Sequence, residues 1–129
     1  MKNRYLVDTH TLIWSFENNK KLPQSMKNII DDARNEIFVS IASLWEMAIK
    51  TSNGKLDLSV SLNQLIEDIV LRNIQILSIS PSHVLKVETL PFHHKDPFDR
   101  IIAAQCLVEN ITAISVDEVL DEYHVNRVF

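Results

Sequence analysis

Four short apolar runs, separated by segments with helical periodicity, restrict this chain to an α/β fold. The runs are RYLVD (4–8), EIFVS (36–40), IQILSI (74–79) and ITAISVD (111–117). Each run is nearly continuous in apolar residues, which is typical of strands that are buried on both faces of a parallel sheet. Alternating strands and helices require right-handed crossovers, so we expect a three-layer α/β/α domain with a central parallel sheet of four or five short strands.

The segments between these runs carry the start and stop signals of helices. We expect helices to begin at Pro23, directly after residue 40, at the capping-box pattern SLNQ (61–64), at Ser80-Pro81 and at Asp96-Pro97. The second of these should end near Asn53-Gly54, the fourth at Pro91 and the last at about Asn110. Neither a repeat nor a linker interrupts this order, so 1–129 is expected to form a single domain.

The composition limits where the protein works. The chain has one cysteine, Cys106, which excludes an intramolecular disulfide and a multi-cysteine zinc site and suits a reducing compartment. No apolar run approaches the roughly 20 residues of a membrane span, and Asp8 and His10 interrupt the N-terminal segment that a signal peptide would need. We therefore expect a soluble, cytoplasmic protein with no membrane partner.

A single glycine, Gly54, excludes whole classes of phosphate-binding site. A P-loop, a dinucleotide-binding turn and a nucleophile elbow all need several glycines at fixed spacing. The formal net charge is −4, from 13 basic and 17 acidic residues, so any nucleic acid must be bound by a local patch. An acidic surface can also hold a cation.

Several acidic residues occupy positions from which they could converge. Asp8 and Asp117 follow the first and fourth expected strands, and ligands of open parallel sheets bind beyond the carboxyl ends of the strands. Glu46 lies one turn into the helix after the second strand, and Asp99 lies in the first turn of the last long helix. Such a ring would attract Mg²⁺ or Mn²⁺, and a metal held by carboxylates with open positions promotes phosphodiester hydrolysis.

Each acid also has a purely structural interpretation. Asp96, Pro97 and Asp99 form a near-ideal helix start, with a cap, a proline at the first position and an acid near the positive end of the dipole. Asp8 and Asp117 could be turn residues, and Glu46 could be a solvated helix residue. The spacing alone leaves these alternatives open.

The order of four motifs resembles one family. YLVDTHTLIW, VSIASLWEMAIK, LPFHHKDPFDRIIAAQC and ISVDEVL resemble, in this order, motifs of the PIN-domain ribonucleases, and among them the VapC-type toxins of bacterial toxin–antitoxin pairs. The resemblance covers essentially the whole chain. The resemblance implies a compact α/β/α domain that cleaves single-stranded RNA with Mg²⁺ or Mn²⁺. It also implies a homodimer and a cognate antitoxin that covers the site.

The motifs assign roles to individual residues. The resemblance implies that the catalytic and metal-binding residues are Asp8, Glu46, Asp99 and Asp117. It makes Asp96 a secondary candidate beside its cap position, and Thr9 and Ser115 groups that orient water or the neighbouring acids. Residues expected to contact the RNA backbone rather than the metal are Arg100, Lys50, Lys95, His93 and His94.

Two other functions remain compatible with the sequence. Asp8 at the end of a first strand could be the nucleophile of a phosphatase or phosphotransferase, although haloacid-dehalogenase-like enzymes need a second aspartate at the position of His10. The chain could also be a catalytically inactive binding module that keeps a PIN-like fold for protein contacts.

Overall fold

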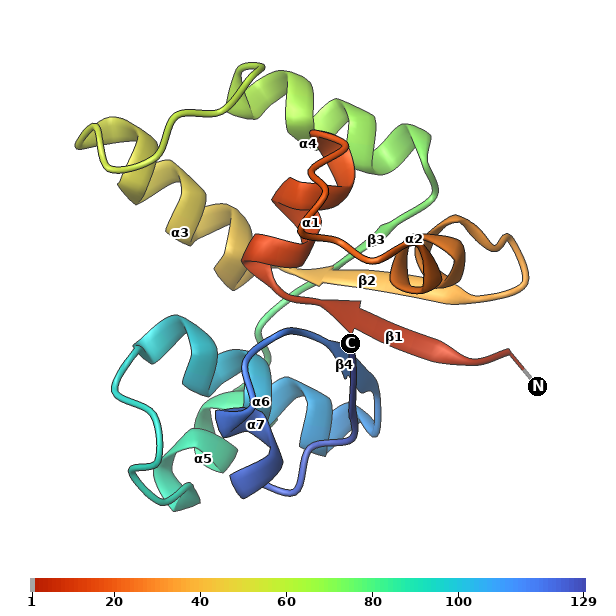
Figure 1. Cartoon of the computed structure of the whole chain (residues 1–129). Coiled ribbons are helices and arrows are strands. Elements are labelled where there is room, and N and C mark those ends of the chain that lie inside the picture. The colour runs from red at the N-terminus through yellow and green to blue at the C-terminus, as the bar shows by residue number, and fades with distance from the viewer. Residues whose placement is uncertain (1) are drawn as a thin grey trace.

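The computed structural model describes residues 2–129 and shows five strands and seven helices in these residues (Figure 1). The strands are β1 (Arg4–Val7), β2 (Glu36–Ser40), β3 (Gln75–Leu77), β4 (Thr112–Ile114) and β5 (Arg127–Val128). The helices are α1 (Thr9–Phe16), α2 (Gln24–Asp31), α3 (Ile41–Ser52), α4 (Leu62–Leu71), α5 (Pro81–Thr89), α6 (Pro97–Glu109) and α7 (Val119–Glu122).

The strands form one parallel sheet in the order β3-β2-β1-β4-β5. Val7 at the end of β1 lies opposite Val39 of β2 and Ile114 of β4. This register aligns the carboxyl ends of the three central strands, so the residues that follow them, among them Asp8, meet at one edge. The predicted three-layer α/β/α fold with a central parallel sheet is confirmed.

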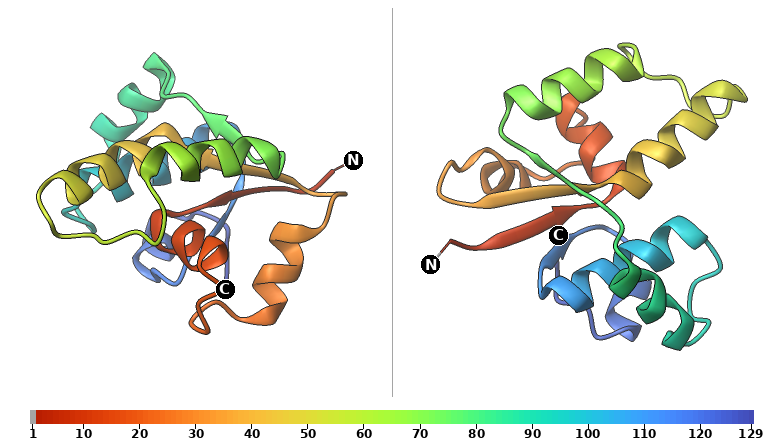
Figure 2. Two further views of the ribbon diagram at one scale, coloured as in Figure 1. Left: turned by 90° about the horizontal axis from the view of Figure 1, so that it is seen from above. Right: turned by 180° about the vertical axis from the view of Figure 1, so that it is seen from behind.

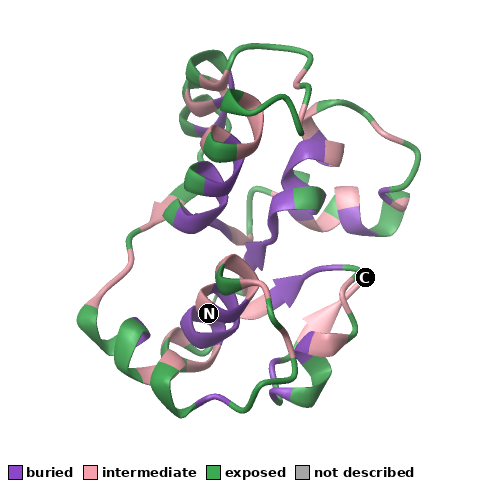
Figure 3. Ribbon diagram, turned by 90° about the vertical axis from the view of Figure 1, so that its left-hand side faces the viewer, coloured by how far each residue is buried: buried purple, intermediate pink, exposed green. Residues whose placement is uncertain are grey.

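The helices cover both faces of the sheet (Figures 1 and 2). Helices α1 to α4 pack on one face around a core that includes Leu12, Met47 and Ile69, whereas α5, α6 and α7 pack on the other around Ile102 and Leu120. Figure 3 shows buried residues on the strands and on the inward sides of the helices, with exposed residues concentrated on outer turns and loops. The strands are thus shielded on both faces, as their apolar composition predicts.

Local signals fix most helix ends where the sequence predicts them. The hydroxyls of Ser61 and Ser80 accept hydrogen bonds from the backbone of the first turns of α4 and α5. Helix α3 ends at Ser52, and Gly54 follows with a φ of +76°, a left-handed conformation that glycine adopts without strain. Pro23 precedes α2 as its cap residue rather than lying in its first turn.

Some elements are shorter than expected or were not predicted. The runs 74–79 and 111–117 contribute only three strand residues each, so Asp117 lies in the turn beyond β4 rather than directly after the strand. Helices α1 and α7 and strand β5 lie outside the predicted elements. In residues 2–129, no helix is long and apolar enough to cross a membrane.

Candidate metal centre

The candidate site lies where the chain connections diverge, beyond the carboxyl ends of β1 and β4. These strands are neighbours, but β1 continues into α1 on one face of the sheet, whereas β4 leads to α7 on the other. Adjacent strands with connections on opposite faces leave a crevice between them, which is where open α/β sheets bind ligands. Most of the predicted acidic residues gather around this crevice.

Asp8 is buried and both of its carboxylate oxygens have partners. Oδ1 accepts a hydrogen bond from the backbone N–H of Thr11 at 2.9 Å, which makes Asp8 the N-cap of α1. Oδ2 accepts a hydrogen bond from the hydroxyl of Ser115. The strand register explains this contact, because Val7 and Ile114 are paired and the next residues lie side by side. Asp8 is therefore both a helix cap and a fixed carboxylate at the crevice.

Glu46 is almost completely buried on α3, so it is not a solvated helix residue. Its Oε1 accepts a hydrogen bond from the hydroxyl of Thr9 at 2.6 Å, and Thr9 in turn lies 2.9 Å from the hydroxyl of Ser43. Its Oε2 pairs with Lys50 Nζ at 2.6 Å, one turn further along α3. This hydrogen bond to Glu46 raises the pKa of Lys50 above its ordinary value, so the lysine stays charged.

Asp99 projects from the first turn of α6 and carries the strongest electrostatic perturbation at the site. Burial raises its pKa from 3.8 to about 7, assisted by the negative charges of Asp96, Glu46 and Asp117 and opposed by His94. These carboxylates are therefore close enough to repel one another. The predicted cap is confirmed, since Asp96 accepts hydrogen bonds from the backbone N–H groups of Phe98 and Asp99.

Asp117 reaches the crevice from the turn after β4. Its Oδ1 accepts a hydrogen bond from the N–H of Val119, and its own N–H donates to the hydroxyl of Ser115. Its Oδ2 lies 2.8 Å from Nε2 of His94, which also lies 3.2 Å from Oδ2 of Asp99. One atom each of His94, Asp99 and Asp117 lies within 4.8 Å of the others, an arrangement that could hold a metal ion.

The residues that were expected to contact RNA have different surroundings in the structure. Lys95 is exposed beside the start of α6, and the ammonium of Lys50 pairs with Glu46. Nδ1 of His93 lies 3.4 Å from a carboxylate oxygen of Glu122 on α7, which is not one of the predicted metal ligands. His94 lies among the acids, with Nε2 close to both Asp99 and Asp117, a position that the sequence did not predict.

Arg100 has a structural position that was not expected. It is only 7% exposed, and its guanidinium donates hydrogen bonds to the carbonyls of Val87, Leu90 and Pro91 and to the hydroxyl of Tyr123. These bonds tie the end of α5 to α6 and α7. With its donors engaged by the protein itself, Arg100 has little capacity left to bind a phosphate, so its expected RNA contact is replaced by a role in the fold.

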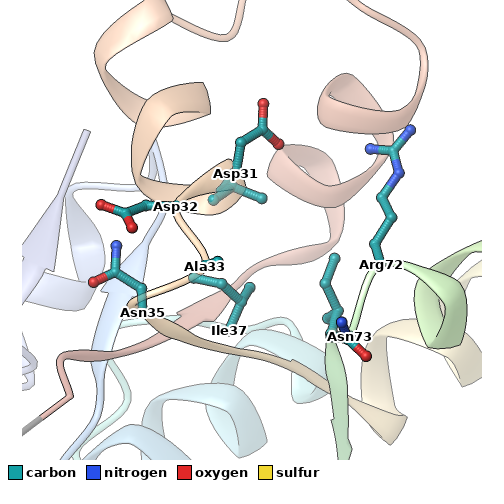
Figure 4. Close-up of a pocket in the computed structure, with 9 residues that line it drawn as sticks. Asp31, Asp32, Ala33, Asn35, Ile37, Arg72 and Asn73 are labelled. Atoms are coloured by element: carbon teal, nitrogen blue, oxygen red, sulfur yellow. The ribbon is translucent and has the colours of Figure 1, made fainter.

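Apart from the crevice, a hollow lies at the opposite edge of the sheet, near the amino ends of β2 and β3 (Figure 4). Asp31 and Asp32 line one side and Arg72 the other. Here the Arg34 guanidinium lowers the pKa of Asp32 to about 2, so the negative charge of this carboxylate is already paired with an arginine. At the carboxyl edge, by contrast, burial and the neighbouring acids raise the pKa of Asp99, and this difference distinguishes the candidate site from the hollow.

Comparison with known proteins identifies the family. The family model described as PIN domain matches residues 5–126. The chain belongs to the PIN domain family. No curated protein matches the sequence.

Solved structures share the PIN fold at low sequence identity. A chain of VapBC2 from Rickettsia felis, solved bound to a promoter DNA fragment, is 19% identical with a TM-score of 0.70, over 97% of each chain. DNA-bound VapBC from Salmonella typhimurium is 13% identical with a TM-score of 0.71, over 99% of this chain and 98% of that one. VapBC-1 from nontypeable Haemophilus influenzae is 18% identical with a TM-score of 0.65, over 97% and 96%.

Two contributors to the site were missed by reasoning from sequence. Ser43 lies one turn before Glu46 on α3, and this i, i+3 spacing was the available signal that both face the crevice. His94 is predicted from the sequence to contact RNA, but no local pattern signals that its ring lies against Asp99 and Asp117. The hydroxyls also serve different acids than expected, since Thr9 contacts Glu46 and Ser115 contacts Asp8.

Proposed function

We propose that this PIN domain is an endoribonuclease toxin that uses Mg²⁺ or Mn²⁺ to hydrolyse RNA phosphodiester bonds. The observation that carries the proposal is the convergence of acidic side chains at the crevice, where one ligand atom each of Asp99, Asp117 and His94 lies within 4.8 Å of the others. Membership of the PIN family supports a nuclease. The similarity of the fold to VapBC chains supports the VapC type.

The residues at the site fit a hard divalent cation. The proposed ligands are the carboxylates of Asp8, Glu46, Asp99 and Asp117, and carboxylate oxygens are the donors that Mg²⁺ and Mn²⁺ prefer. Asp96, whose Oδ1 caps α6, is proposed mainly as a helix cap and only secondarily as a ligand. A cation at this point would relieve the repulsion that raises the pKa of Asp99.

When bound, the cation would act as a Lewis acid toward the phosphodiester and lower the pKa of an attacking water. The protein groups around it orient the acids. Thr9 and Lys50 fix the two oxygens of Glu46, and Ser115 fixes Asp8. In-line attack of water on phosphorus would leave a 5′-phosphate and a 3′-hydroxyl.

The rim of the site offers groups for holding RNA. Lys95 is exposed beside α6 and could bind a backbone phosphate, which positions a substrate without reading its sequence. The exposed ring of Trp45 and the half-buried ring of Phe98 lie edge to face, with centroids 5.1 Å apart, and line an apolar hollow of about 450 Å³. Aromatic faces stack on unpaired bases, so these rings suit single-stranded RNA.

We also propose that a cognate antitoxin neutralises the protein and that the protein forms a homodimer in the cytoplasm. Solved structures with the same fold include VapBC from two bacteria, and further ones, 15 and 16% identical, are FitAcB and FitAB. The exposed apolar side chains beside the site, among them Trp45, Val84 and Phe92, provide a surface that a protein partner would cover.

The test is cleavage of single-stranded RNA by purified protein with Mg²⁺ or Mn²⁺. Asp99→Asn should lower the rate by more than about 100-fold, because even groups that only orient metal ligands typically contribute 10- to 100-fold. Asp32→Asn, an acid-to-amide change at the opposite edge of the sheet, should leave the rate unchanged. Wild-type rates for Asp99→Asn, or cleavage that persists in excess chelator, would overturn the proposal.

The phosphatase alternative is disfavoured by the surroundings of Asp8. Haloacid-dehalogenase-like enzymes need a second aspartate two residues after the nucleophile, and that position holds His10, whose side chain is exposed. Release of phosphate from a small phosphomonoester, together with a covalent phospho-enzyme, would favour the alternative over RNA cleavage.

A further inference from the structure

His94 is placed among the acids in a way that the proposed metal site does not require. Its Nε2 lies 2.8 Å from Asp117 Oδ2 and 3.2 Å from Asp99 Oδ2, so one imidazole nitrogen bridges two of the proposed metal ligands. The oxygens that it contacts are those that a cation would need. His94 is therefore either a further ligand of the metal or a competitor for the same oxygens.

The other nitrogen of the ring decides between these possibilities. Nδ1 of His94 accepts a hydrogen bond from the backbone N–H of Asp96 at 3.1 Å. An acceptor nitrogen carries no hydrogen, so the hydrogen of the neutral ring is on Nε2, from which it is donated to the carboxylates. A metal-ligating histidine has the reverse arrangement, with a lone pair on the metal and the other N–H donated outward. That arrangement would direct Nδ1–H against the N–H of Asp96.

We propose that His94 is a positioning residue that holds Asp99 and Asp117 together in the metal-free protein and competes with the divalent cation for their oxygens. The hydrogen on Nε2 is donated to the carboxylate oxygens of Asp117 and Asp99, at the point where a cation would bind. Binding of the cation then requires the ring to turn away. This inference rests on the proposed function only in needing a cation at these acids.

The backbone around His94 allows the ring to move without disturbing the site. The N–H of His94 donates to the hydroxyl of Tyr123 at 2.8 Å, and this hydroxyl also accepts a hydrogen bond from the buried Arg100. Residues 91–96 are not part of a helix or strand, and the side chain of His94 is 20% exposed. The main chain is thus anchored, while the ring can rotate toward solvent when a cation displaces it.

The test is binding of Mn²⁺ to the purified protein. Calorimetry measures the affinity, and the electron paramagnetic resonance signal of free Mn²⁺ measures it independently. His94→Ala should bind Mn²⁺ about tenfold more tightly than the wild type, because two hydrogen bonds to charged groups no longer have to be broken. His93→Ala is the matched control and should leave the affinity unchanged, since that ring pairs with Glu122. Weaker or unchanged binding by His94→Ala would overturn the inference.

A second variant and a spectroscopic measurement guard against misfolding. The amide of His94→Gln retains an N–H donor at a reach similar to that of Nε2, so its affinity should lie between those of the wild type and His94→Ala. Nitrogen-15 spectra of the metal-free wild type should show the hydrogen of His94 on Nε2; a hydrogen on Nδ1 overturns the inference whatever the affinities are. If no variant binds Mn²⁺, the cation site itself fails, whereas weaker binding by His94→Ala overturns this inference alone.

Discussion

Two buried threonines of α1, Thr9 and Thr11, show how a single hydroxyl serves the site. The hydroxyl of Thr9 donates to Glu46 at 2.6 Å, whereas that of Thr11 is buried without a hydrogen-bond partner among the described residues. Valine has nearly the same shape as threonine, so replacing each residue removes a hydroxyl with little change in packing. The pair therefore separates the orientation of Glu46 from the packing of α1.

Thr9→Val is expected to lower RNA cleavage by about tenfold or more, because Glu46 loses a group that fixes its carboxylate. Thr11→Val should cleave at the wild-type rate and be as stable as the wild type or more stable, since an unpaired buried hydroxyl is costly. Steady-state cleavage and thermal unfolding of both variants provide the comparison. Equal losses of activity in the two variants would show that Thr9 acts only through packing.

The pKa of Asp99 leads to a prediction about stability and pH in the absence of metal. Its pKa is about 7 in the folded protein and 3.8 in an ordinary environment, so between these values the folded state binds the proton more tightly than the unfolded state. Stability from this residue is complete below about pH 4 and is lost as the pH rises through 7. Asp99→Asn mimics the protonated form and should remove this dependence.

In excess chelator, the stability of Asp99→Asn relative to the wild type should increase between pH 5 and pH 8 by about 1 to 2 kcal/mol, since partial exposure reduces the effect of the full shift. Thermal unfolding followed by circular dichroism at both pH values measures the difference. Asp32→Asn is the control and should show no change relative to the wild type between pH 5 and pH 8, because the pKa of that carboxyl, about 2, and its ordinary value of 3.8 both lie below this range. If the difference in stability between Asp99→Asn and the wild type is the same at both pH values, the raised pKa of Asp99 is contradicted.

Among the elements, the start of α6 combines a structural and an electrostatic role in neighbouring residues. Asp96 caps the helix with Oδ1, and its charge raises the pKa of Asp99. Asparagine caps a helix about as well as aspartate, whereas alanine does not. Two substitutions at one position therefore distinguish the cap from the charge.

Asp96→Ala should lower the free energy of unfolding by about 1 kcal/mol, whereas Asp96→Asn should be close to the wild type in stability. Both variants should keep the Mg²⁺ affinity of the wild type within a few fold, because Asp96 is proposed as a cap rather than as a ligand. Urea unfolding and calorimetric Mg²⁺ titration of the pair provide the two measurements. Loss of Mg²⁺ binding in Asp96→Asn would instead make Asp96 a metal ligand.

The elements that could be predicted from sequence are those with strong local signals. The four apolar runs correspond to β1 to β4, and caps or prolines mark the starts of α4, α5 and α6. Helix α1 was not predicted, because only one residue separates its start at Thr9 from the end of β1, and no loop or turn residues mark its start. Strand β5 has only two residues and is defined by its pairing with β4, a long-range contact that no local pattern reports.

The candidate site was predictable in its acids but not in its contacts. Parallel strands bring Asp8 and Asp117 to one edge, and the motif order adds Glu46 and Asp99. The inward turn of His94 depends on the backbone N–H of Asp96 and on the hydroxyl of Tyr123, which is distant in sequence. The burial of Arg100 depends on carbonyls at the end of α5 that only the packing of α5 on α6 brings within reach.

At the scale of the whole molecule, the site joins the two layers of helices. Glu46 comes from α3 in one layer, Asp99 comes from α6 in the other, and Asp8 and Asp117 come from the connections at the sheet edge between them. A cation bound by all four would cross-link both layers to the sheet. Its binding free energy would then stabilise the entire fold, because the unfolded chain has no such site.

Mg²⁺ is therefore expected to raise the melting temperature of the wild-type protein at pH 8. A concentration about 100 times the Kd adds about 2.7 kcal/mol, which corresponds to a shift of the order of 10 °C for a chain of this size. Asp99→Asn should lose most of this shift, whereas Asp32→Asn should keep it, and K⁺ at matched ionic strength should have little effect on any of the three. Thermal unfolding over a series of Mg²⁺ concentrations gives the comparison. A wild-type melting temperature that does not respond to Mg²⁺ would favour the remaining alternative, a catalytically inactive PIN domain that keeps its fold for protein contacts.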